Sequence, residues 1–105
     1  MGYATADDRR KIEDVGPWAG RDVPRTVWSQ LERTAANFGD RPAITFQLFA
    51  GPEDKAETLT FAELKSQVAQ AANLFRELGV GPSDKVAFLL PNCNETIVTY
   101  LGGMV

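Results

Sequence analysis

The chain has 105 residues, a hydrophobic fraction of 44%, a charged fraction of 24% and a formal net charge of −3. These values suit one small domain, and the dispersed charges disfavour nucleic acid as a partner. With no histidine and one cysteine, Cys93, a His-dependent triad, a Cys/His zinc site and an internal disulfide are excluded.

Residues 1–24 hold glycines, prolines and mixed charges without a sustained period, which indicates an extended polar arm. Trp18 is the one side chain that we expect to anchor this arm. The domain proper is then expected to span residues 25–105. No apolar run approaches the roughly 20 residues that cross a bilayer, and the first residues lack the pattern of a secretory leader. We therefore expect a cytoplasmic protein without a transmembrane segment.

A first helix is predicted from the cap residue Thr26 to Gly39, which is placed to end it. Its apolar positions recur at spacings of three and four residues, as Trp28, Leu31, Ala35 and Phe38. From Pro42 the period changes to two, which is typical of a half-buried strand. Its predicted inner face consists of Ile44, Phe46 and Leu48. A second short strand at Glu57–Leu59 favours an antiparallel hairpin with a long loop.

The next helix has the clearest signals in the chain. Thr60 and Glu63 have the spacing of a capping box, and Gly79 falls where a left-handed residue would close the helix. One helical face is marked between them by Phe61, Leu64, Val68, Ala71, Phe75 and Leu78.

Val86–Leu90 is apolar on both faces, which predicts a strand covered on two sides. After Pro91, Asn92 and Glu95 repeat the capping-box spacing, and a last helical face is marked by Ile97, Tyr100, Leu101 and Met104. These elements predict an α/β fold, in which a small mixed sheet of a hairpin plus a buried strand packs with three helices. Because the last helix shows no stop signal before Val105, we interpret the chain as part of a larger domain.

Candidate chemical motifs are few. Gly79 and Gly81 do not form a dinucleotide motif, because the third glycine would fall at Asp84 and the pair precedes a strand. Cys93 is expected at the first helical position after Asn92, but it lacks a base partner and is interpreted as a buried structural cysteine. The sequon at Asn94 is interpreted as chance.

Four carboxylates, Glu57, Glu63, Glu77 and Asp84, are interpreted as surface or capping groups. We therefore predict no catalytic, cofactor-binding or metal-binding residue in this segment.

Four stretches follow one another in an order that resembles the amino-terminal segment of an adenylate-forming (AMP-binding) enzyme of the acyl-CoA synthetase, or fatty acid–CoA ligase, branch. They are TVWSQLERTAANFGDRPAI, LTFAEL from Leu59, GVGPSDKVAFLLPN from Gly79, and the helix after it. The resemblance covers residues 25–105 and implies an incomplete amino-terminal portion of the acyl-CoA synthetase-like fold. Ser83 departs from the family, which often has glycine before the aspartate.

The resemblance implies a parent enzyme that adenylates a fatty acid with ATP and magnesium and passes the acyl group to coenzyme A. The family's phosphate loop, ribose-binding aspartate, hinge and mobile lysine would follow Val105, so no such role falls on a numbered residue. The expected partners are the remainder of the parent enzyme and its fatty acid, and the isolated segment is expected to be inactive and to self-associate. An adenylation module of a peptide synthetase and a free-standing interaction domain remain alternatives.

Overall fold

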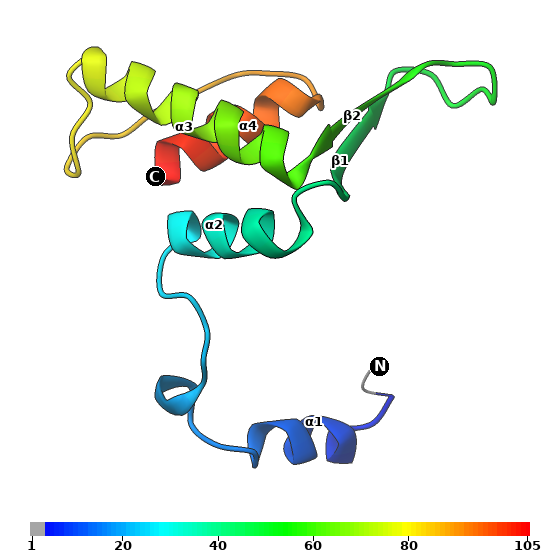
Figure 1. Cartoon of the computed structure of the whole chain (residues 1–105), viewed down its shortest axis with the longest axis vertical. Coiled ribbons are helices and arrows are strands. Elements are labelled where there is room, and N and C mark those ends of the chain that lie inside the picture. Colours follow the sequence, from blue (N-terminus) through cyan, green and yellow to red (C-terminus); the bar gives the residue numbers. More distant parts are fainter. Residues whose placement is uncertain (1–3) are drawn as a thin grey trace.

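The computed structural model describes residues 4–105, so residues 1–3 of the expected arm lie outside the described part of the chain. Within residues 4–105 the chain forms four α-helices, one 3-10 helix and two strands. Their bounds are α1 (Ala6–Glu13), the 3-10 helix (Trp18–Gly20), α2 (Val27–Phe38), β1 (Pro42–Gln47), β2 (Ala56–Thr60), α3 (Phe61–Glu77) and α4 (Asn94–Met104) (Figure 1). The predicted α/β class is confirmed.

The hairpin forms as the period of two predicts. β1 and β2 pair antiparallel, with Ile44 opposite Leu59 and Thr45 opposite Thr58. The two threonine hydroxyl oxygens lie 2.9 Å apart on the outer face, whereas Ile44 and Leu59 pack against the core. Leu48, which was predicted to continue the inner face, lies beyond the end of β1 and is 70% exposed.

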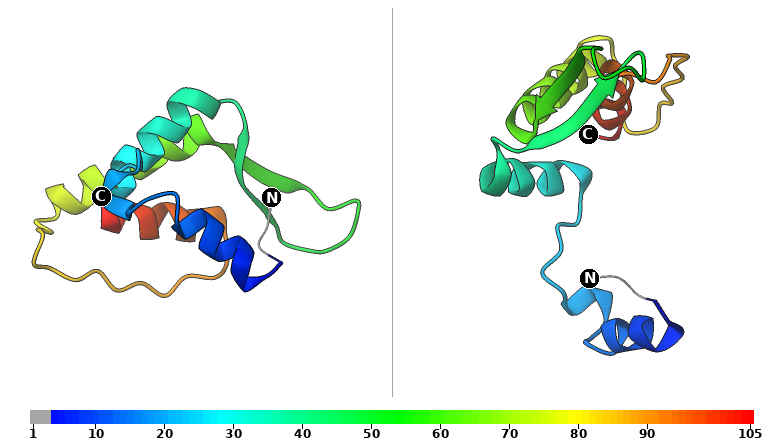
Figure 2. Two further views of the ribbon diagram at one scale, coloured as in Figure 1. Left: turned by 90° about the horizontal axis from the view of Figure 1, so that it is seen from below. Right: turned by 90° about the vertical axis from the view of Figure 1, so that its right-hand side faces the viewer.

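α3 is the centre of the fold, because it contacts α2, α4 and both strands (Figures 1 and 2). Leu64 and Val68 of α3 and Leu31 of α2 form the buried core. Partly buried hydrophobic residues complete it, namely Trp28, Ala43, Ile44, Leu59, Val98, Leu101 and Val105. The predicted apolar faces of α2 and α3 are thus confirmed near their middles. Phe38 and Leu78, at the two C-terminal ends, are 45% and 70% exposed.

The predicted buried strand at Val86–Leu90 is wrong. The segment forms neither helix nor strand and joins no sheet within the described residues, and Leu89 is 99% exposed. A strand is defined by a partner that accepts and donates its backbone hydrogen bonds, and no other described segment supplies one. The sheet is therefore a two-stranded antiparallel hairpin instead of a mixed sheet.

The last helix forms, but its cap and its buried face differ from the prediction. α4 begins one residue later than expected, because its N-cap residue is Cys93 and not Asn92, and the cap makes no side-chain hydrogen bond. Its inward positions include Asn94 and Gly102, both buried, and Leu101 of the predicted face, which packs against the core, whereas Ile97 and Tyr100 are 40% and 53% exposed. The reason lies in the close approach of α3 and α4.

At that approach, a β-carbon built on Gly102 would lie 2.7 Å from the Cβ of Ala71. Ala72, which the sequence pattern did not assign to the inner face, is buried at the same place. Since small residues permit such close helix packing, Gly102 lies at the closest approach to α3, while Ile97 and Tyr100 are turned toward solvent.

The arm also differs from the prediction, because part of it is helical. Thr5 and Asp8 form a complete capping box at the start of α1, a purely local signal that does not need an apolar period. α1 buries none of its residues and lies apart from the other helices (Figures 1 and 2). Trp18 is not an anchor, since it is 62% exposed. The arm is instead tied to α2 by Arg33, which donates to the carbonyl oxygen of Asp22 at 3.0 Å and to its carboxylate at 3.2 Å.

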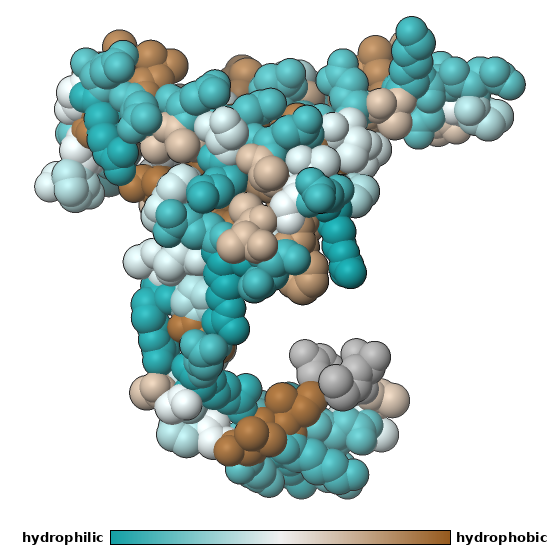
Figure 3. All heavy atoms as spheres, in the orientation of Figure 1, coloured by the Kyte–Doolittle hydropathy of each residue, from teal (hydrophilic) through white to brown (hydrophobic). Residues whose placement is uncertain are grey.

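The surface is mainly hydrophilic on the face shown in Figure 3, where hydrophobic residues gather beside α1 and near the end of α3. None of the helices in the described part of the chain combines the length and apolar character that a membrane span requires.

Candidate functional site

The junction between β2 and α3 is the first candidate for a phosphate site made of backbone N–H groups. Thr60 ends the strand and caps the helix: its hydroxyl accepts from the Glu63 N–H at 3.2 Å, and its own N–H donates to the Glu63 carboxylate at 2.9 Å. The N–H groups of Phe61 and Ala62 donate to carbonyl oxygens of the α2–β1 connection at 3.1 and 3.0 Å. A helix N-terminus binds anions through free N–H groups, and all four here are occupied.

The glycine turn after α3 is equally closed. Gly79 adopts the predicted left-handed conformation, with φ of +83°. Its N–H donates to the carbonyl oxygen of Arg76, and the next N–H, that of Val80, donates to the carbonyl oxygen of Phe75 at 2.9 Å. These two hydrogen bonds are those of a Schellman motif. The Gly81 N–H donates to the Asp84 carboxylate at 2.7 Å. These glycines therefore end a helix, as predicted, and their amides cannot cradle a phosphate.

Cys93 is half-buried at the N-cap position of α4. Its sulfur lies 3.3 Å from the Thr96 hydroxyl, which also donates to the carbonyl of Pro91. The pKa of the Glu95 carboxyl lies below its ordinary value, because its own backbone N–H and then the Cys93 side chain hydrogen-bond to the carboxylate. The thiol thus contacts a hydroxyl and a carboxylate, whereas activated thiols lie beside cationic groups. These contacts favour a structural role for Cys93, but the residue is half-buried and not buried as predicted.

Asn94 is 7% exposed, and its side-chain amide donates to the Glu57 carbonyl of β2 at 3.0 Å. This bond joins the start of α4 to the hairpin. It also makes the amide unsuited to carry a glycan, because acceptor asparagines lie on the surface.

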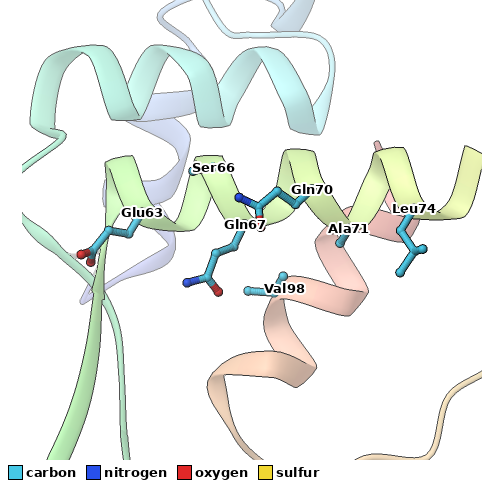
Figure 4. Close-up of a pocket in the computed structure, with 7 residues that line it drawn as sticks. All are labelled: Glu63, Ser66, Gln67, Gln70, Ala71, Leu74 and Val98. Atoms are coloured by element: carbon cyan, nitrogen blue, oxygen red, sulfur yellow. The ribbon is translucent and has the colours of Figure 1, made fainter.

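A groove of about 500 Å³ runs between α3 and α4. Figure 4 shows its residues: Glu63, Ser66, Gln67, Gln70, Ala71, Leu74 and Val98. Gln67 and Gln70 project from α3 on the side where Val98 rises from α4. The two amides can hydrogen-bond a ligand, but the one ionisable group, Glu63, is already committed to the helix cap. The groove therefore offers no acid–base pair, and no lining residue could act as a general base for the Ser66 hydroxyl.

Neither the two turns nor the groove described above offers a set of groups that fits ATP or magnesium. Among residues 4–105, no three histidine, cysteine or carboxylate side chains lie close enough to hold a metal ion. Glu63 caps α3 and Asp84 closes the glycine turn, as the sequence predicted for both. Since metal and phosphate sites need converging oxygen ligands or free N–H donors, these residues serve the fold.

Comparisons with known proteins identify the family to which this fold belongs. Residues 31–104 match the family model described as AMP-binding enzyme. The chain is 44% identical over 66 residues to an acetyl-coenzyme A synthetase of Streptomyces avermitilis, an alignment that covers 63% of this chain and 10% of the relative. It is 34% identical over 95 residues to acetyl-coenzyme A synthetase 1 of Candida albicans, covering 90% of this chain and 14% of the relative.

A third relative is the long-chain-fatty-acid–CoA ligase of Bacillus subtilis, 30% identical over 101 residues, with coverage of 87% of this chain and 17% of the relative. The chain thus spans only 10 to 17% of the length of these relatives. No solved structure matches it. The family match extends from the middle of α2 to the end of α4 and includes the capped start of α3 and the glycine turn. The chain belongs to the AMP-binding enzyme family.

Proposed function

We propose that residues 25–105 are the amino-terminal scaffold of an ATP-dependent acid–thiol ligase. The whole enzyme converts a carboxylic acid to its acyl-adenylate and transfers the acyl group to coenzyme A. The family match over residues 31–104 carries this proposal, and the relatives named as CoA ligases or synthetases support it.

In this proposal, ATP, magnesium and coenzyme A are held by other residues of the whole enzyme. The occupied amides at Thr60–Glu63 and Gly79–Gly81 support that division. The role of α3 is then to fix the hairpin, α2 and α4 relative to one another. A rigid scaffold of this kind supports a site built on other loops.

We further propose a fatty acid of medium or longer chain as the substrate. The alignment with a long-chain-fatty-acid–CoA ligase over 87% of this chain supports it. Acetate is the second candidate, favoured by the 44% identity to an acetyl-coenzyme A synthetase. The matched positions described above are caps, turns and core residues, so identity among them reports the shared scaffold more directly than the acyl pocket.

The experiment is a coenzyme A-dependent ligase assay of the full-length enzyme that contains this segment. Hexadecanoic acid, octanoic acid, acetic acid, benzoic acid and a set of amino acids are compared by kcat/KM. We expect the highest value for one of the two longer fatty acids. A preference for acetate would select the second candidate, whereas preference for an amino acid, or transfer only to a carrier-protein thiol, would refute the CoA-ligase assignment.

A further inference from the structure

We draw no further inference here: the strongest candidate, the unpaired apolar segment Val86–Leu90 between the glycine turn and α4, carries nothing because no part of the structure described for residues 4–105 shows what covers it.

Discussion

Gly102→Ala tests the close contact between α3 and α4. The added β-carbon would lie 2.7 Å from the Cβ of Ala71, whereas ordinary carbon contacts are about 3.5–4.0 Å. The helices must therefore separate by about 1 Å or repack, and overpacking of this kind costs about 1–3 kcal/mol. Alanine gains about 0.8–1.0 kcal/mol over glycine from helix propensity, so the net loss of unfolding free energy should be roughly 0–2 kcal/mol.

The neighbouring glycine provides a matched control. A β-carbon on Gly103 meets only the Phe75 ring at 4.0 Å, so Gly103→Ala keeps the propensity gain without the clash. The two variants should differ by about 1–3 kcal/mol in urea unfolding followed by far-UV circular dichroism. Ala71→Gly should rescue Gly102→Ala, because it removes the opposing carbon. Equal unfolding midpoints for Gly102→Ala and Gly103→Ala would refute the close packing of the two helices.

Three further substitutions separate the roles of individual side chains. Thr60→Ala should lower the unfolding free energy by about 1 kcal/mol through loss of the α3 cap, while Thr5→Ala should leave the unfolding midpoint unchanged because α1 buries nothing; equal shifts would contradict this. Asn94→Ala should lower the unfolding free energy by about 1 kcal/mol, because the buried hydrogen bond from its side-chain amide to β2 is lost. A comparable loss in the exposed control Asn73→Ala would argue against that role. Cys93→Ala should leave the turnover of the full-length ligase largely intact, and loss of turnover with the fold preserved would show that the thiol takes part in the chemistry.

The sequence predicted those features that depend on neighbouring residues. The cap at Thr60, the left-handed Gly79 and the period of two in β1 each depend on bonds or faces within a few residues, and all three are confirmed. The spacing of Gly79 and Gly81 predicted a helix-ending turn instead of a dinucleotide motif. In the structure the N–H groups of both glycines donate hydrogen bonds within that turn.

The features that the sequence did not predict depend on distant partners. The apolar run Val86–Leu90 has the composition of a strand, but a strand also needs a ladder partner, which composition does not reveal. The inward face of α4 was predicted from four large apolar residues, of which Leu101 packs against the core. Gly102 was not predicted to face inward, and it does so because the separation of α3 and α4 admits no side chain there. The groove between α3 and α4 was also missed, since its amides carry no apolar period and no recognisable motif.

ATP–pyrophosphate exchange by the purified 105-residue chain, freed of host synthetases, tests the scaffold role most directly. The chain lacks converging metal ligands within residues 4–105, and the amides at the start of α3 and in the glycine turn are occupied. We predict exchange at background for acetic, octanoic, hexadecanoic and amino acids, with the full-length ligase active in parallel on its own acid. Acid-dependent exchange above background by the 105-residue chain would contradict the proposal that these residues supply the scaffold and not the chemistry.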